Sequence, residues 1–396
     1  MKTLSPAFLP DELIFEVLSF LPVRSLVRFR CVSKSWKTLI SDSTFVKLHL
    51  HNSRSQTRNS SLLKIITKNT ICIPGYHVEH KEEFSIVRHP IHRVFQNHSF
   101  AVVYDSHSHL WNNPAITRNY STIVDSCNGL LLLEVVSETV YGFEYWLCVW
   151  NICDPSRDFD FAFGCDNSTG AYKVVAFCKR ETTSDVKVLN LGVDVWRNIE
   201  SFPVVLDHEH VCLSGTINWL ATPTIHTSDT VEHSVIVSLD LETEAYKQYT
   251  VPRGVDEVLP DSPTIGVLGG CLCFSYLHRE THFDIVIWQM KKFGVEDSWT
   301  QFLKVSYHDL LIDYGNFSDN DICYFQLVPL FLSEDGDSLI LQSNLESQTI
   351  LLYDRRHNRA KRTEIIASTT IADFRNSNYV YQDFAKDYVE SLVPIF

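Results

Sequence analysis

Two hydrophobic patterns divide the chain. Between residues 9 and 40 apolar positions recur every three or four residues, which is the spacing of one face of an α-helix. After residue 60 they occupy short runs rich in β-branched and aromatic side chains, such as VIVSLDL at 235–241 and FDIVIWQM at 283–290. The pattern predicts a small helical unit at the N-terminus followed by a large all-β domain.

Three short helices are expected in the N-terminal unit. The first runs from Pro10 to Pro22, a second follows directly, and Ser33 can cap a third that carries Trp36. Three helices in about thirty residues cannot enclose a full core, so we expect a partner to cover the surplus apolar surface. The alternative, coverage by the rest of this chain, is disfavoured because a compact helical unit fits the faces of an all-β body poorly. The surplus residues are Leu9, Pro10, Ile14, Leu18, Leu21, Pro22, Leu26 and Val32.

Three motifs make this unit resemble an F-box. They are LPDEL at 9–13, LPVRSL at 21–26 and CVSKSW at 31–36. Proteins with an F-box are similar in docking through it onto the small Skp-type adaptor of a cullin-based ubiquitin ligase, while the rest of the chain selects the substrate. The resemblance implies that Leu9 and Pro10 enter the adaptor groove and that Trp36 braces the third helix. It also implies an apolar interface formed by Ile14, Leu18, Leu21 and Leu26.

Composition and charge exclude several other classes of protein. The 396 residues carry a net charge of −14, and Lys and Arg are dispersed outside 34–37 and 355–362, which argues against a nucleic-acid surface. No apolar run approaches the roughly 20 residues that a membrane span requires. The 11 cysteines, an odd number, form no paired framework, which indicates a reducing compartment. We therefore expect a soluble protein of the cytoplasm, the nucleus or both.

Repeated units are visible in the β domain. Trp196, Tyr246 and Trp299 occupy matching places in successive units and are spaced by about 50 residues, as in the blades of a propeller. Five such units can be recognised between residues 127 and 366. Residues 61–125 and the C-terminal tail are less regular and could supply a further blade closed by strands from both ends of the chain. The expected fold is an α+β multidomain protein in which a three-helix unit precedes a propeller-like domain of six or seven blades.

The expected domain boundaries follow from these patterns. Residues 1–48 form the helical unit and residues 61–396 form the β domain. Between them, HLHNSRSQTRNS at 49–60 is polar and hydroxyl-rich, and we expect it to be a linker.

Motifs of the β domain extend the resemblance over nearly the whole chain. SCNGLL at 126–131, LSGTINWL at 213–220 and LGGCL at 268–272 resemble plant proteins in which an F-box precedes an F-box-associated domain, often named F-box/kelch-repeat proteins. The resemblance implies a non-catalytic, substrate-recognition subunit of an SCF-type (Skp/cullin/F-box) ubiquitin ligase. Its implied partners are a Skp-type adaptor, through it a cullin and a RING subunit, and an unknown protein substrate.

Catalytic and metal-binding sites are disfavoured by the sequence. His107 with His109, His208 with His210, and the stretch 278–284 could each bring imidazoles together, but no third ligand stands at a diagnostic spacing. The sequence also has no nucleophile elbow, phosphate-binding glycine loop or dinucleotide fingerprint. We therefore expect no cofactor and no metal. Two alternatives stay open, a propeller that binds a sugar or other small ligand without a role in ubiquitination, and a metal-dependent propeller enzyme.

Loops are the expected place for substrate recognition, because they can vary without disturbing a rigid β core. The candidate segments are 104–111, 226–233, 278–283 and 314–320. The repeated tryptophans are instead expected to pack blade against blade. They are Trp146, Trp150, Trp196, Trp219, Trp288 and Trp299.

Overall fold

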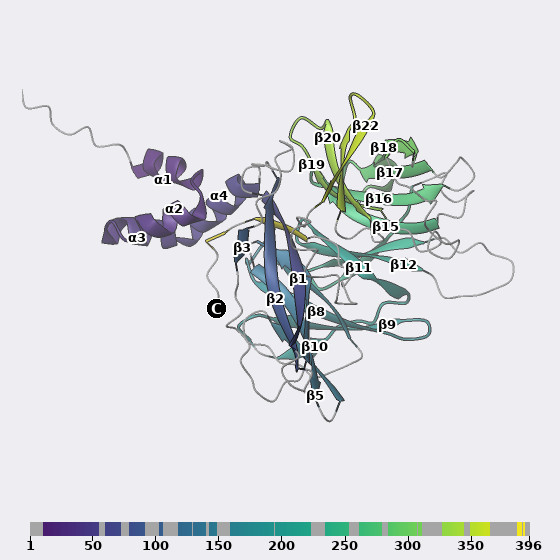
Figure 1. Cartoon of the computed structure of the whole chain (residues 1–396), viewed down its shortest axis with the longest axis horizontal. Coiled ribbons are helices and arrows are strands. Elements are labelled where there is room, and N and C mark those ends of the chain that lie inside the picture. The colour runs from purple at the N-terminus through teal and green to yellow at the C-terminus, as the bar shows by residue number, and fades with distance from the viewer. Residues whose placement is uncertain are drawn as a thin grey trace, which may run out of the picture.

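The computed structural model shows a small group of helices beside a large domain of β-sheets (Figure 1). None of the helices in the described part of the chain is long and apolar enough to cross a membrane. The structure describes residues 11–54, 60–72, 79–91, 103–105, 118–128, 130–139, 142–148, 159–193, 195–222, 234–252, 261–278, 284–306, 308–310, 327–343, 349–364, 386–389 and 391–392.

Four helices, one more than predicted, form what we call the helical module. Ser33 caps α3 as expected, since its hydroxyl accepts a hydrogen bond from the backbone N–H of Trp36 at 3.1 Å. Asp42 caps α4 in the same way, accepting from the N–H of Thr44 at 2.8 Å. The helices are α1 (Asp11–Ser19), α2 (Val23–Phe29), α3 (Lys34–Ser41) and α4 (Ser43–Arg54).

The fourth helix corrects the predicted linker at 49–60, because residues 49–54 are its second half. Phe45, His49 and Ser53 follow one another at helical spacing and are all buried. His49 donates from Nε2 to the carbonyl oxygen of Leu21 at 2.9 Å, which satisfies one end of its imidazole inside the module. This segment is polar in sequence, but in the structure it contributes to a buried face of α4. The next strand begins at Ser60.

The β domain contains six antiparallel sheets in its described residues, which we number as blades 1 to 6. Blade 1 consists of β23 (Lys386–Val389), β1 (Ser60–Cys72), β2 (Glu79–Pro90) and β3 (Val103–Asp105). Blade 2 consists of β4 (Arg118–Cys127), β5 (Leu130–Thr139) and β6 (Gly142–Cys148). Blade 3 consists of β7 (Asp160–Cys165), β8 (Tyr172–Lys179), β9 (Ser184–Asn190) and β10 (Trp196–Asn198).

The remaining three blades follow the same plan of four strands. Blade 4 consists of β11 (Val205–Leu213), β12 (Thr216–Thr222), β13 (Val235–Asp240) and β14 (Tyr246–Thr250). Blade 5 consists of β15 (Asp261–Leu268), β16 (Cys271–His278), β17 (Asp284–Met290) and β18 (Trp299–Ser306), with the short 3-10 helix η2 (Glu296–Ser298) before its last strand. Blade 6 consists of β19 (Leu327–Leu332), β20 (Ser338–Ser343), β21 (Thr349–Asp354) and β22 (Arg359–Glu364).

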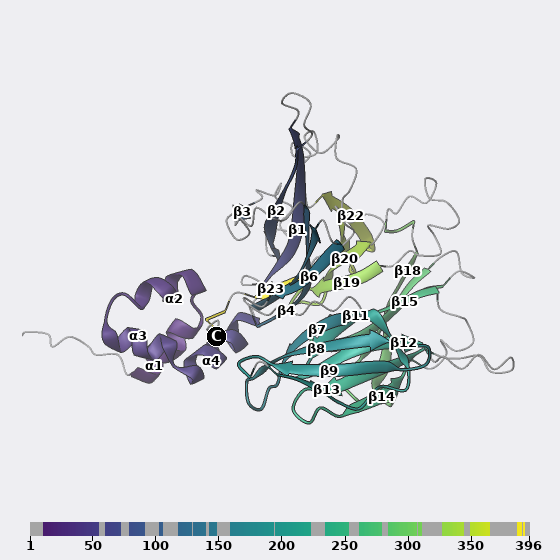
Figure 2. The same cartoon turned by 90° about the horizontal axis from the view of Figure 1, so that it is seen from below.

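The first strands of successive blades contact one another and close into a ring, which confirms the predicted propeller-like domain. Figure 2 shows the helical module at one side of these sheets. The contacting pairs are β4 with β7, β7 with β11, β11 with β15, β15 with β19, β19 with β23, and β23 with β4. Blade 1 takes its inner strand from the C-terminus, because β23 pairs antiparallel with β1 and places Val389 opposite Ser60. The predicted blade closed from both ends of the chain is therefore present, and it completes the ring.

Aromatic side chains seal the contact between blades. Trp219 is fully buried in the cluster between blades 3 and 4, where its ring meets the edges of Phe177 and Phe202 at centroid distances of 5.6 and 6.1 Å. Trp196 and Trp299 each begin the outermost strand of a blade and pack, partly buried, on a core cluster. These tryptophans are structural, as expected.

Candidate functional site

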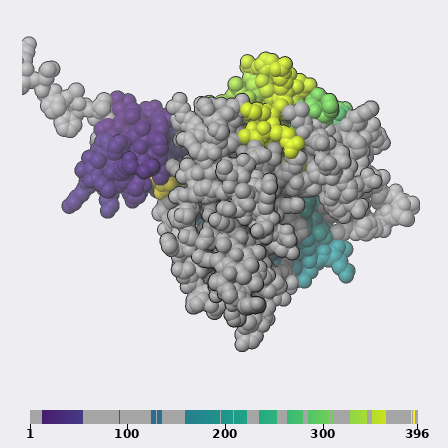
Figure 3. Space-filling model, in the orientation of Figure 1, coloured from purple at the N-terminus to yellow at the C-terminus, as the bar shows by residue number. Residues whose placement is uncertain are grey.

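The helical module projects from the side of the molecule, where Figure 3 shows it in purple. Its own core is small and is built from the fully buried Leu18, Leu26, Ile40 and Phe45. Several large apolar side chains stay exposed, and we call them the apolar face of the module. They are Leu13, Val17, Phe20, Val27 and Val32.

This apolar face has a helical origin. Leu13, Val17 and Phe20 are spaced by four and three residues, so they share one side of α1 and of the turn that ends it. The β domain leaves them uncovered, although the alternative considered for the sequence was coverage by the rest of the chain. An exposed apolar surface of this kind, rimmed by polar residues, is typical of a protein–protein contact.

The predicted adaptor residues fall into three groups. Leu9 and Pro10 lie outside the described residues. Pro22 and Val32 are exposed, and Ile14, Leu21 and Trp36 are half-buried against the module core. Leu18 and Leu26 are 4% and 0% exposed, so each belongs to the core of the module itself. Their direct contact with an adaptor stays a prediction.

Sequence reasoning did not include Leu13, Val17, Phe20 and Val27 among the contact residues, although they are the exposed members of the apolar pattern. The recurrence of apolar residues every three or four positions indicated a broad apolar stripe on the helices. It did not show which residues of that stripe the short helices bury against one another. That choice depends on α4, which contacts α1 and α3 and was not expected.

Three contacts among the described residues join the helical module to the propeller. Leu392, which follows β23, packs on the module core, and α4 contacts β23 directly. At the last residue of α4, Arg54 donates to Oδ1 of Asn128, in the turn between β4 and β5. The strand that closes the propeller therefore also anchors the module.

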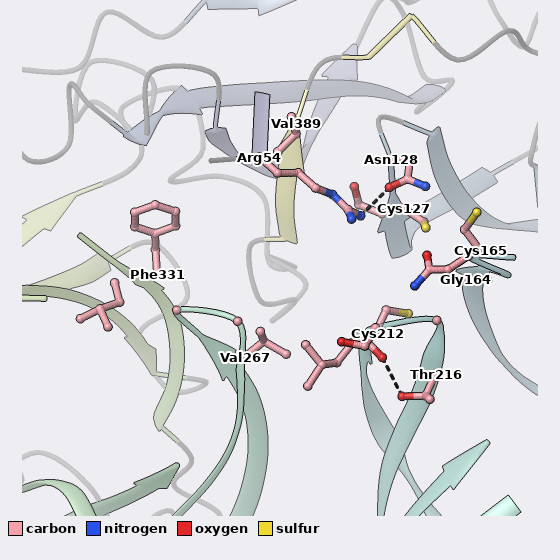
Figure 4. A pocket seen from close by; sticks show the side chains of 18 of the residues that line it. Arg54, Cys127, Asn128, Gly164, Cys165, Cys212, Thr216, Val267, Phe331 and Val389 are labelled. Atoms are coloured by element: carbon pink, nitrogen blue, oxygen red, sulfur yellow. Dashed lines mark hydrogen bonds between the residues drawn. The ribbon is translucent and has the colours of Figure 1, made fainter. Parts of the chain in front are cut away.

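A cavity of about 760 Å³ opens where the module meets the propeller axis. All six blades contribute to its lining, and Arg54 enters from α4 (Figure 4). The axis of a ring of sheets is a place where side chains from every blade converge, so we call this the axial cavity. Labelled lining residues in Figure 4 include Cys127, Asn128, Gly164, Cys165, Cys212, Thr216, Val267, Phe331 and Val389.

Tight turns between the first two strands of blades 2, 4 and 5 shape part of the rim of the cavity. Ser214 with Gly215 and Gly269 with Gly270 form two-residue turns in which both residues have positive φ. Asn128 takes the equivalent first position, with φ of 53°, and adds an amide side chain there. Because Asn tolerates this conformation better than most residues, the turn can carry a hydrogen-bonding group at the rim.

Three polar side chains meet beside the cavity, and of these Cys212 lines it. Oδ2 of Asp125 lies 3.0 Å from Nε2 of His210, which donates to it, and 3.4 Å from the sulfur of Cys212. His210 and Cys212 project from the same face of β11, whereas Asp125 belongs to blade 2. The sequence had paired His210 with His208, but its partner in the structure is this distant carboxylate.

The thiols of the cavity behave as apolar groups. Burial raises the pKa of Cys127, and the nearby Cys165 and Asp125 raise it further. Burial also raises the pKa of Cys165, and this effect outweighs the opposing influence of Arg54. Both thiols are consequently neutral near pH 7 and supply polarisable surface rather than charge.

The other sequence candidates contribute little to a site. No group of three His, Cys, Asp or Glu side chains within the described ranges is arranged to hold a metal ion. His107 and His109 lie outside the described residues. The loop candidates 226–233 and 314–320 also lie outside the described residues. The same holds for residues 106–111 of the candidate 104–111 and for residues 279–283 of the candidate 278–283.

Comparison with known proteins gives the same two-part division. Residues 8–48 match the F-box domain, and residues 117–395 match the F-box associated beta propeller domain. An F-box/kelch-repeat protein of Arabidopsis thaliana is 28% identical over 330 residues, which cover 76% of this chain and 80% of the relative.

Two further Arabidopsis thaliana relatives align over most of the chain. F-box protein CPR1 is 24% identical over 362 residues, covering 85% of this chain and 80% of the relative. Jacalin-related lectin 38 is 24% identical over 391 residues, covering 88% of this chain and 66% of the relative. This chain belongs to the family of F-box proteins that carry an F-box associated beta propeller domain.

Proposed function

We propose that this chain is the substrate-recognition subunit of an SCF-type (Skp/cullin/F-box) ubiquitin ligase. The apolar face of the helical module is the observation that carries the proposal, because it leaves large apolar side chains in solvent on a unit that matches the F-box domain. A Skp-type adaptor covers this face and connects the chain to a cullin and a RING subunit. The propeller then holds a protein substrate.

The mechanism of such a subunit is proximity. Binding raises the effective concentration of substrate lysines near a ubiquitin-conjugating enzyme, which supplies the thioester chemistry. The chain itself contributes binding energy and orientation rather than a catalytic group. The contacts of Arg54 and Leu392 between module and propeller favour this role, since such contacts limit where the bound substrate can reach.

Strand direction suggests where the substrate binds. In blades 2 to 6, the connections between the first two strands lie at the rim of the axial cavity, on the side where Asn128 meets Arg54 of the module. Because the strands are antiparallel, the connections after β12 and β16 leave from the opposite side of the domain. The predicted recognition segments 226–233 and 278–283 belong to these connections. We propose the side away from the module as the substrate side.

Adaptor binding can be tested with two matched surface variants. Val17 in the apolar face and Val193 in blade 3 are 63% and 62% exposed, so a charge at either position should leave the fold intact. Val17→Asp should weaken binding of a plant Skp-type adaptor by about tenfold or more, since it removes a buried contact and desolvates a carboxylate. Val193→Asp should not change it. Affinity is measured by titration calorimetry with the full chain.

Leu18→Asp provides a second test with a different expected cause. This variant should also lose the adaptor, but through disruption of the module core, and circular dichroism should show a loss of helix. Equal adaptor affinity for the Val17→Asp variant and the unmodified chain would contradict the proposed interface. A complex that forms would justify a substrate search by proximity labelling.

A further inference from the structure

We infer that the axial cavity is a binding site for a small organic anion with an apolar body, such as an arylalkyl carboxylate. Its two sides differ in chemistry, its size suits a small molecule, and its cationic group comes from the helical module. The inference concerns a ligand separate from the protein substrate and from the adaptor.

The polar side of the cavity presents a cation and two amides. Arg54 is exposed at the end of α4 and has no salt-bridge partner among the described residues; its guanidinium donates to Asn128. The five N–H groups of a guanidinium exceed what this single amide oxygen can accept, so donors are left for a ligand. Asn167 of blade 3 also lines this side. A planar carboxylate matches the geometry of these donors.

The amide of the exposed Asn167 lies close to the glycine turn of blade 4. A Cβ atom built on Gly215 would lie 3.0 Å from Nδ2 of Asn167, so the glycine turn of blade 4 leaves the space that the amide occupies. The amide thus stands where blades 3 and 4 meet the cavity.

The opposite side of the cavity is apolar. Val267 of blade 5 and Phe331 and Leu332 of blade 6 line it. Figure 4 shows Phe331 and Val267 across the cavity from Asn128 and Cys165. These side chains offer an aromatic and aliphatic wall that would pack against a ring or short alkyl chain.

Charge and size select among possible ligands. Beside the cavity, the carboxylate of Asp125 accepts hydrogen bonds from His210 and the backbone N–H of Phe163, and it is not among the residues that line the cavity. Glu334 of blade 6 lines the cavity and is exposed, which disfavours a second negative charge on the ligand at that end. A volume of about 760 Å³ lies within the usual range for small-molecule sites. A monoanion with one apolar end fits this arrangement.

Three probes of equal size test the charge preference on the unmodified full chain. They are 4-phenylbutyrate, 4-phenylbutan-1-ol and 4-phenylbutylamine, each titrated by calorimetry. We expect saturable binding of the carboxylate with a dissociation constant of about 1 mM or below, the alcohol to bind about tenfold more weakly, and the amine more weakly still. Equal or tighter binding of the amine would overturn the inference, as would the absence of saturable carboxylate binding.

Variants of the two sides locate the site. Arg54→Gln should reduce carboxylate affinity to that of the alcohol, whereas Arg180→Gln, at the turn between β8 and β9 and outside the cavity lining, should leave it unchanged. Phe331→Ala should weaken the carboxylate and the alcohol by similar factors. Thermal unfolding of each variant checks that the fold is kept. Unchanged carboxylate affinity in folded Arg54→Gln protein would refute the site even if a probe binds elsewhere.

Discussion

The helical module and the propeller differ in how they bury apolar side chains. In the module a core of four fully buried residues leaves a larger set of apolar side chains in solvent. In the described part of the propeller, the exposed large hydrophobic residues are Val193, Val195 and Val295. Each blade there has a neighbour on both sides, so its apolar faces are covered by the next sheet.

Size explains the difference. A unit of about 45 residues cannot bury most of its surface, whereas a ring of sheets closes on itself and leaves few open apolar faces. The incomplete burial in the module is therefore available for a partner, and the propeller can present loops and a central cavity without exposing its core. This division of labour predicts that substitutions will separate the two functions.

The largest effect is expected from Trp219→Ala in the propeller core. The change removes a fully buried indole that contacts Phe177 and Phe202, which should lower the free energy of unfolding by about 3–5 kcal/mol. Thermal unfolding followed by near-ultraviolet circular dichroism measures the loss. Adaptor affinity should be retained at a temperature where the module is folded; loss of adaptor binding there would show that the two parts fold as one unit.

A somewhat smaller effect is expected from Glu244→Gln, which breaks the ionic contact between blades 3 and 4. Glu244 accepts from Lys173, whose side chain is 6% exposed, at 2.8 Å and from Arg197 at 2.6 Å. Burial tends to raise the pKa of Glu244, but these two cations outweigh it and lower the pKa. The substitution leaves a buried ammonium without its counter-charge and should cost about 3 kcal/mol in urea unfolding.

The double variant Lys173→Met with Glu244→Gln sharpens this result. It removes both the buried charge and its partner, so it should recover part of the stability lost in Glu244→Gln alone. The double variant could instead lose as much additional free energy of unfolding as Glu244→Gln lost on its own. The two side chains would then contribute independently, and the ion pair would not be the source of the effect.

Much of the propeller could be predicted because its units repeat. The matched positions of Trp196, Tyr246 and Trp299 are the first residues of the outermost strands β10, β14 and β18, so the repeat located the blades correctly. The same repeat left residues 61–125 as the remainder. The structure uses β1, β2 and β3 from this stretch, with β23, for blade 1, and residues 118–125 for β4 of blade 2. The repeat predicts the blades because each blade packs against its neighbours in the same way and therefore needs similar residues at matching positions.

The junction could not be predicted from the same patterns. The second half of α4 was taken for a linker because its buried positions are occupied by His49 and Ser53 rather than by aliphatic residues. Arg54 and Asn128 lie far apart in the sequence and meet only when the ring and the module are both in place. Asp125 and His210 likewise come from different blades, blade 2 and blade 4. Contacts of this kind depend on tertiary structure, and a single sequence carries no local signal for them.

A moderate, pH-dependent effect is expected at Asp166, in the turn between β7 and β8. Burial tends to raise the pKa of this carboxyl, but hydrogen bonds from Thr169 and Ser168 outweigh it and lower the pKa to about 2. Because the folded pKa is lower than the unfolded one, the stabilisation is present above about pH 4 and is lost as the pH falls toward 2.

Asp166→Asn should therefore reduce the free energy of unfolding by about 2 kcal/mol at pH 7 and flatten its decline between pH 4 and 2. Urea unfolding at a series of pH values measures both quantities. An unchanged slope in this pH window would mean that another carboxyl dominates acid unfolding of the propeller.

Leu392→Ala is expected to have the smallest effect on stability. It tests directly whether the module and the propeller are joined through the C-terminal segment. Leu392 is only partly buried against the module core, so its truncation should cost about 1 kcal/mol. Because it follows the strand that closes blade 1, it connects the two parts through the C-terminal segment. Hydrogen exchange should show faster opening of α4 and unchanged protection of blades 3 to 5. Equal acceleration in those blades would mean that the segment stabilises the ring rather than the junction, and the module would then owe its position to Arg54 and Asn128.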